Sequence, residues 1–259
     1  MVRQTTRRVQ PSRTNGIMAV QRWRLIVRRS AAAADLSQRD LLESWATTLR
    51  DSGLTTTPPT PAVPEPKLVF AAPLPLRTTA DRELVDLILP DRLTSADLRS
   101  RLSPNLPPGH ELIDLADIWI GEPALPGLVV AADYDVTIRA VAPDPWIDAG
   151  ALDEGIAAML AADVIPRDRP GKAALNIRPL ITAVVRDSPA AGLVLLMRLR
   201  LDPALGSGRP DDVVTALSAS LGQPIEVVAQ NRTRLWLRGE RTEDLESPAG
   251  AGGRGIGGR

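Results

Sequence analysis

The order of the predicted elements is the feature that most restricts the fold, because the same order occurs twice along the chain. Alternating apolar positions indicate strands, and apolar stripes at helical spacing indicate helices. Residues 20–119 read as strand, helix, strand, strand, helix, strand, and residues 133–237 repeat this order. In the ferredoxin-like plan, such a unit places two helices on one face of a four-stranded sheet. The sequence therefore predicts an α+β fold of two tandem ferredoxin-like (βαββαβ) halves with antiparallel sheets.

Capping residues set the bounds of the predicted helices. Ser37 is followed three residues later by Asp40, which is typical of a helix start, and Gly53 marks the end of that helix. Pro210 and Gly222 bound the last helix in the same way. We expect helices at 37–53, 94–102, 148–162 and 210–222, and strands at 20–29, 67–74, 83–89, 111–119, 133–141, 173–178, 193–201 and 225–237.

Proline and glycine divide the chain into segments. Residues 55–66 hold five prolines, which favour an extended loop. The end of the chain is mostly Gly, Ala and Arg, a composition that cannot bury enough surface to fold. We expect a disordered extension at 1–17, a first half at 18–120, a linker at 121–127, a second half at 128–240 and a disordered Gly/Arg tail at 241–259.

Composition excludes several classes of function. The 259 residues hold no cysteine and one histidine, which excludes thiolate metal sites and leaves little room for a Ser–His–Asp hydrolase. We expect His110 to be an exposed turn residue, and we expect no catalytic residue, metal or cofactor in a chain that is not an enzyme. No apolar run reaches ~18 residues, so we expect a cytoplasmic protein without a membrane partner.

Arginine dominates the positive charge and follows the strand alternation. All but two of the 31 basic residues are arginine. Alternation puts Arg22, Arg24 and Arg28 on the face of the first sheet that no helix covers. On the corresponding face of the second sheet we expect a patch of Arg139, Arg198, Arg200, Arg232 and Arg234.

Such arginine faces need anions close by. RNA phosphates are one source, through bidentate guanidinium contacts. Carboxylates are another: Asp86 and Asp114 are candidates to face Arg24, Asp135 shares a face with Arg139, and the two faces can also pack on each other. The predicted strands lack the exposed aromatic residues that RNA-recognition sheets use for stacking.

The densest basic cluster lies in a loop of the second half. Arg167, Arg169, Lys172 and Arg178 fall within twelve residues. The glycine and the Ser or Thr of a phosphate-binding P-loop are absent at the corresponding positions. The cluster is therefore either an anion-binding loop or a solvated turn.

Several runs of the sequence resemble the radical-SAM-linked family, domain of unknown function 2344. They are SQRDLLESWATTLRDSGL (37–54), PKLVFAAPLPL (66–76), ELVDLIL (83–89), RPGKAALNIRPLI (169–181) and RPDDVVTALS (209–218). The resemblance covers residues 20–237 in order. It implies an accessory role beside a radical SAM protein, with RNA or the ribosome as a further partner, and it carries no family reaction.

The chain departs from the family pattern at two places. Gln38 stands where the family has a histidine, and of the family's Gln-Gly-Phe-Asn-Pro-His-Pro-Lys loop only Pro66 and Lys67 remain. The resemblance thereby implies Lys67 as a binding candidate. Without the cysteine motif for an iron–sulfur cluster, the chain is not itself the radical enzyme.

Three functions follow from these observations. The first is a non-catalytic accessory or RNA-binding partner of a radical SAM, RNA-modification or ribosome-related system. The second is an RNA-processing endonuclease built on paired ferredoxin-like domains, for which His110 is the one histidine present. The third is a structural interaction module without a ligand.

Overall fold

The computed structural model describes residues 21–55, 65–141, 146–169, 171–187, 193–203 and 205–240. The expected extension at 1–17, the expected tail at 241–259 and most of the proline-rich loop lie outside these described residues. No helix in the described part is long and apolar enough to cross a membrane.

The first half of the fold follows the predicted order closely. Ser37 accepts a hydrogen bond from the amide of Asp40 at the start of its first helix, and Thr94 does the same for Asp97 at the second. Its elements are β1 (Gln21–Arg29), a 3-10 turn (Ala31–Ala33), α1 (Gln38–Asp51), β2 (Lys67–Phe70), β3 (Thr78–Leu89), α2 (Ser95–Leu102), a 3-10 turn (Ser103–Asn105) and β4 (His110–Ile118).

A short helix leads into the second half. The elements are α3 (Leu125–Leu128), β5 (Val129–Ala140), α4 (Ala149–Ala161), β6 (Pro166–Arg169), β7 (Lys172–Asn176), a 3-10 turn (Arg178–Leu180), β8 (Ile181–Asp187), β9 (Leu193–Asp202), β10 (Gly206–Ser207), α5 (Pro210–Leu221) and β11 (Ile225–Leu237). Gly222 ends α5 with a φ of 64°, a left-handed conformation that glycine adopts without a steric cost.

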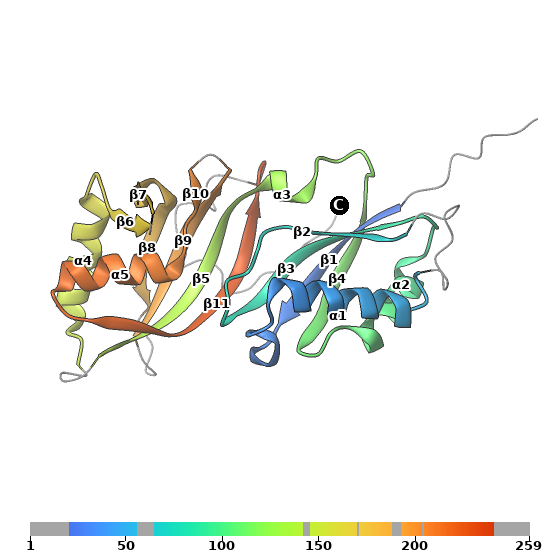
Figure 1. Cartoon of the computed structure of the whole chain (residues 1–259), viewed down its shortest axis with the longest axis horizontal. Coiled ribbons are helices and arrows are strands. Elements are labelled where there is room, and N and C mark those ends of the chain that lie inside the picture. The colour runs from blue at the N-terminus through green and yellow to red at the C-terminus, as the bar shows by residue number, and fades with distance from the viewer. Residues whose placement is uncertain are drawn as a thin grey trace, which may run out of the picture.

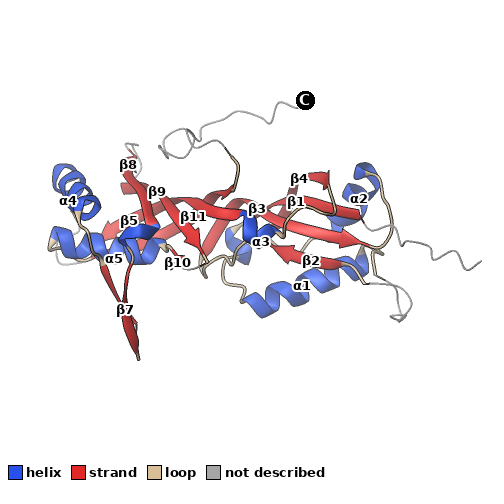
Figure 2. Cartoon of the chain, turned by 90° about the horizontal axis from the view of Figure 1, so that it is seen from above, coloured by secondary structure: helices blue, strands red, loops and turns tan. Residues whose placement is uncertain are grey.

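One expected strand is wrongly placed in the sheet. The strand predicted at 173–178 is β7, which pairs with β6 in a separate hairpin that Figure 2 shows projecting from the main sheet. The position beside β9 belongs instead to β8, which the sequence analysis did not predict. Pro179 precedes β8 and obscured the start of its apolar run.

The remaining strands form one mixed sheet, and not two antiparallel sheets. Its order is β10-β9-β5-β11-β3-β1-β4, with β2 also paired to β3 and β8 also paired to β9. The antiparallel expectation is wrong where the halves meet, because β11 pairs with β3 in parallel. Figure 1 shows this sheet running across both halves, with α1 and α5 in front of it.

The two halves are joined along the part of the β3 edge that does not pair with β2. The four residues of β2 pair with Val85–Ile88 of β3, and Gln230–Arg232 of β11 pair with Thr78–Ala80 farther along the same edge. An unpaired strand edge carries free N–H and C=O groups, so this second pairing satisfies backbone groups that would otherwise be left over.

Two apolar cores lie under the helices. In the first half, Trp45 of α1 and Leu98 of α2 pack with Leu25 and Leu87 of the sheet. In the second half, α4 and α5 pack on β5, β8, β9 and β11, with Leu152 and Leu217 fully buried. The two cores fix the positions of the strands that carry the charged side chains described below.

Candidate functional site

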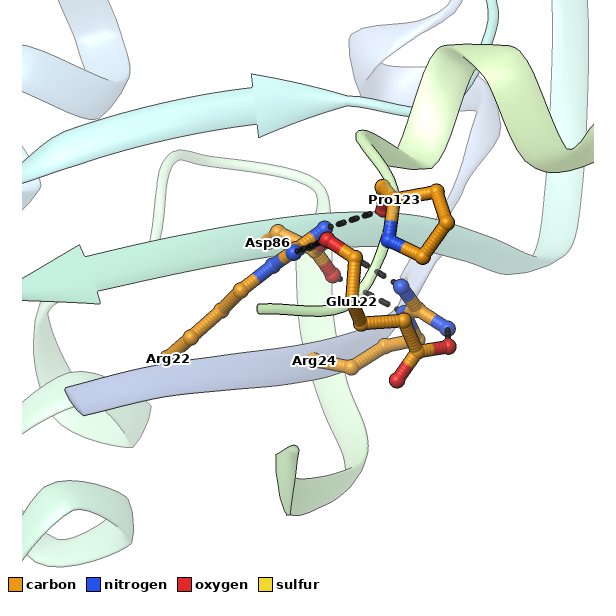
Figure 3. Close-up of polar contacts among 5 residues, drawn as sticks. All are labelled: Arg22, Arg24, Asp86, Glu122 and Pro123. Atoms are coloured by element: carbon orange, nitrogen blue, oxygen red, sulfur yellow. Dashed lines mark hydrogen bonds and ion pairs between the residues drawn. The ribbon is translucent and has the colours of Figure 1, made fainter. Parts of the chain in front are cut away.

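The arginines of the first sheet face converge on a single carboxylate. Asp86 on β3 is fully buried, and its Oδ2 accepts hydrogen bonds from Arg22 Nε at 3.0 Å and Nη2 at 2.5 Å. Its Oδ1 accepts from Arg24 Nε at 2.9 Å. Figure 3 shows both guanidinium groups turned toward Asp86. Of the anions expected to face Arg24, the structure therefore shows a carboxylate, that of Asp86.

The segment between the halves covers this ion-pair cluster. Arg22 Nη1 donates to the carbonyl of Glu122 at 2.6 Å, and Nη2 donates to that of Pro123 at 3.0 Å (Figure 3). The Glu122 carboxylate lies 3.7 Å from Arg24. The segment at 121–127 is thus held against the sheet by a buried arginine.

The arginines of the second half do not form the expected exposed patch. Arg198 is 1% exposed and donates to both oxygens of Asp133, at 2.7 and 2.8 Å. Arg198 and Arg234 both lie against the ring of Trp236, with their guanidinium carbons 4.4 and 3.7 Å from its centre. Cation–π contact and ion pairing together remove Arg198 from solvent.

The expectation that Arg232 and Arg234 share a face is wrong because β11 contains a bulge between them. Arg232 is opposite Tyr134 and Arg234 is opposite Asp133, so their partners are neighbours on β5. Adjacent residues of a strand point to opposite faces, and a bulge therefore separates the two arginines. Arg232 is buried and pairs with Glu83 of the first half.

The other two members of the expected patch are exposed. Arg139 pairs with Glu226 across the β5–β11 ladder. Arg200 has no ion-pair partner among the residues that the structure describes. Lys67 is exposed at the start of β2. These three residues lie on three different strands.

The basic loop is the β6–β7 hairpin, and its described side chains turn to separate partners. Arg167 Nη1 lies 3.0 Å from Asp212 of α5. Arg178, which follows the hairpin, donates to the carbonyl of Leu160 at the end of α4, where the helix dipole favours a cation, and to the carbonyl of Ile181 in β8. The side chains of Arg169 and Lys172 lie outside the described part of the chain. Arg167 and Arg178 do not converge on one anion site.

A pocket between α1 and the first-half sheet is a candidate site, because it brings a buried arginine and aromatic rings together. We call it the Trp45 pocket; its cavity has a volume of about 30 Å³. Its walls come from β1, α1, β2, the segment after β2, β3 and β4. They are formed by Val27, Arg29, Gln38, Leu41, Trp45, Phe70, Ala72, Leu74, Glu83, Val85 and His110.

Aromatic rings build one wall of the Trp45 pocket. Trp45 meets Phe70 edge to face, with ring centres 6.1 Å apart, and meets His110 in the same way at 6.2 Å. His110 is half-buried, so its expectation as an exposed turn residue is wrong. Burial lowers the pKa of His110, the carbonyl of Pro108 opposes this, and the charge of Arg29 lowers it further.

Charged groups form the other wall. Glu83 pairs with Arg232, which also donates to the carbonyls of Ala72 and Pro73. Burial acts to lower the pKa of Arg232, but Glu83 and Tyr134 outweigh it and raise that pKa above its ordinary value. Burial also raises the pKa of Tyr134, against the attraction of Arg232. The pocket wall is therefore continuous with the joint between the two halves.

The chemistry available in the Trp45 pocket is recognition through apolar contact and charge. No group of three or more potential metal ligands occurs among the described residues. Sequence reasoning missed Arg29 and Glu83, because alternation assigns them to the helix-covered face where charges are rare. The one residue of the pocket that the sequence marks is Trp45, which belongs to the apolar stripe of its helix.

Exposed aromatic residues occur outside the sheet. Trp119 and Trp146 are each 73% exposed, but Trp119 follows β4 and Trp146 precedes α4. They do not form the stacking surface on strands that an RNA-recognition sheet requires.

Comparison with protein families gives a match over most of the chain. Residues 22–229 match the family described as "Uncharacterized protein conserved in bacteria (DUF2344)". The chain belongs to the DUF2344 family. The matched range begins in β1 and ends within β11, so it contains the Trp45 pocket but stops just before Gln230–Arg232, the part of β11 that joins the halves.

Other comparisons are weaker. No curated protein matches the sequence of this DUF2344 chain. Among solved structures, a Cbf5-Nop10-Gar1 complex is similar with a TM-score of 0.45 and 8% identity, covering 83% of this chain and 50% of that chain. A dye-decolorizing protein from V. cholerae gives a TM-score of 0.22 with 10% identity, covering 84% of this chain and 92% of that one. Ferric DtpA from Streptomyces lividans gives 0.25 with 15% identity, at 90% and 95% coverage. These TM-scores are too low to support an argument about function.

Proposed function

We propose that this DUF2344 protein is a non-catalytic accessory protein that binds its partner through the Trp45 pocket. The observation that carries the proposal is the composition of that pocket: apolar and aromatic walls around a small group of buried charges. Binding pockets for small groups commonly have this construction, with few polar groups to fix orientation. Most of the arginines that were candidates for RNA are held by carboxylates or carbonyls of the chain itself.

The proposal also concerns the identity of the partner. The sequence resemblance supports a radical SAM enzyme, an RNA-modification enzyme or a ribosome-related complex as the partner. The proposal keeps RNA as the alternative to a protein partner, bound through the exposed side chains of Arg200 and Lys67. The two modes differ in a simple property, because RNA binding weakens steeply with salt and is lost on nuclease treatment.

The proposal also includes a ferredoxin-like origin for each half. In the first half the strand order is β2-β3-β1-β4, and in the second half it is β8-β9-β5-β11. In both, the first and third strands of the half lie side by side, flanked by the second and fourth. This agreement supports two related units, joined here into one sheet.

Affinity capture from the native host tests the function. We expect the tagged chain to retain a radical SAM or RNA-modification protein after nuclease treatment, as identified by mass spectrometry. Ala72→Val adds volume inside the Trp45 pocket and should abolish that capture. Ala116→Val, on the exposed part of β4, is the matched control and should not change it. Equal capture by both variants contradicts the role of the pocket, and capture that nuclease abolishes identifies RNA as the partner.

A further inference from the structure

Arg29 differs from the other buried arginines in lacking a carboxylate. It is 4% exposed and lines the Trp45 pocket. Arg22, Arg198 and Arg232 are equally buried, and each has an ion-pair partner. Within the described residues, no Asp or Glu lies at ion-pair distance from Arg29. Burying a charge without a counter-charge is unfavourable, so this arrangement calls for an explanation.

Backbone carbonyls satisfy part of the Arg29 side chain. Its Nε and Nη2 donate to the carbonyl of Ala33, and Nη2 also reaches those of Ala34 and Leu36. An arginine carries five N–H donors, two of them on Nη1. Among the described residues, Nη1 has no hydrogen-bond acceptor. Arg29 therefore supports the loop at 33–36 and still has two donors available.

The charges around the pocket do not balance. Among the acidic groups, Glu83 has the largest electrostatic influence on Arg29, but it already pairs with Arg232. The two arginines and one glutamate leave an excess of one positive charge. His110 adds no negative charge, and Asp35 is exposed. An anion that enters the pocket gains from this excess without displacing an existing ion pair.

We propose that the Trp45 pocket binds a carboxylate that carries an apolar tail, with the carboxylate paired to Arg29. This inference rests on the proposed function insofar as both use the same pocket. The cavity of about 30 Å³ holds about two water-sized groups, which matches the two oxygens of a carboxylate. Arginine recognises carboxylates with particular strength because its donors are charged and planar. Val27, Phe70 and Leu74 line the same pocket as Arg29 and offer apolar surface to the tail.

Two sources supply this chemistry: a free organic acid, and the C-terminal carboxylate of a partner chain. The purified full chain is titrated with hexanoate and with hexanamide, which has the same tail and no charge. The readout is the NMR signal of the Trp45 indole N–H, because that ring forms a wall of the pocket. A charged hydrogen bond contributes about 1.5–3 kcal/mol, so hexanoate should bind roughly tenfold or more tightly than hexanamide.

Variants locate the binding. Ala72→Val should abolish the hexanoate response, and Ala116→Val should retain it. Arg29→Met should reduce the affinity for hexanoate to that for hexanamide; if this variant does not fold, the comparison of the two ligands decides the question. Equal affinity for both ligands, or no response to hexanoate at millimolar concentration, overturns the proposal.

A second pair of ligands distinguishes the sources. A peptide ending in leucine is compared as the free acid and as the C-terminal amide. Tighter binding of the free-acid peptide than of hexanoate identifies a chain end as the ligand, and the opposite order identifies a free organic acid. Capture of a partner that Ala72→Val abolishes, without hexanoate binding, overturns this inference alone. Hexanoate binding without any captured partner overturns the accessory function alone.

Discussion

Removal of the Asp86 carboxylate should destabilise the fold strongly. Asp86 is fully buried and accepts four hydrogen bonds, two from Arg22 and two from Arg24. In Asp86→Ala, two guanidinium groups lose their common counter-ion, which for a buried pair costs about 3–5 kcal/mol. Arg22 keeps the carbonyls of Glu122 and Pro123 as acceptors. We therefore expect a loss near the lower limit, about 3 kcal/mol.

Denaturant unfolding measures this loss, with circular dichroism as the signal and the shift of the midpoint as the result. The control is Glu111→Ala, which removes the partner of Arg28 in an exposed pair. Exposed ion pairs contribute below about 1 kcal/mol, so this variant should unfold close to the parent protein. If Asp86→Ala also costs below about 1 kcal/mol, the reasoning from burial and pairing is refuted.

Three further variants test other parts of the structure. Arg232→Met removes the ion pair between the halves and should destabilise the fold by about 3–5 kcal/mol, with faster amide exchange at 78–80. Burial lowers the pKa of His110 in the folded chain, so the unfolded chain binds more protons below about pH 6.5 and the free energy of unfolding should fall as the pH decreases through this range. His110→Gln should weaken this pH dependence, as measured by denaturant unfolding at pH 5 and pH 7.5. Burial, followed by the charge of Asp81, raises the pKa of Asp135, so at neutral pH its ionised form is less favourable in the folded chain than in the unfolded chain. Asp135→Asn should therefore raise the denaturant midpoint of unfolding at pH 7 and leave it unchanged at pH 4.

Four of the five described α-helices and most strands could be predicted from the sequence, because their signals are local; the four-residue α3 overlaps the segment that was expected to be a linker. The caps Ser37 and Thr94 act within one turn of the chain, and the apolar alternation of 225–237 gives the bounds of β11 without error. The carboxylate facing Arg24 was also among the predicted alternatives, since Asp86 lies on the expected face of β3.

Apart from the missed strand β8, the errors concern contacts between distant residues. The bulge between Arg232 and Arg234 cannot be recognised from the apolar alternation, yet it reverses the face of the side chains from Arg234 to the next bulge at Trp236. The pairing of β11 with β3 depends on an edge left free because β2 has only four residues. The Trp45 pocket is built by residues from β1, α1, β2, β3 and β4, which are far apart in the sequence, so composition and spacing gave no indication of Arg29.

The central position of β11 has a consequence for how the protein forms during synthesis. β11 lies between β5 and β3, although it is the strand farthest along the described chain. Its Arg232 pairs with a glutamate 149 residues earlier. Contacts over such separations form slowly, and exposed strand edges favour aggregation in the meantime. A nascent chain therefore carries two incomplete sheets until residues 225–237 have left the ribosome, and a translational pause before that point is the stage at which chaperone protection matters most.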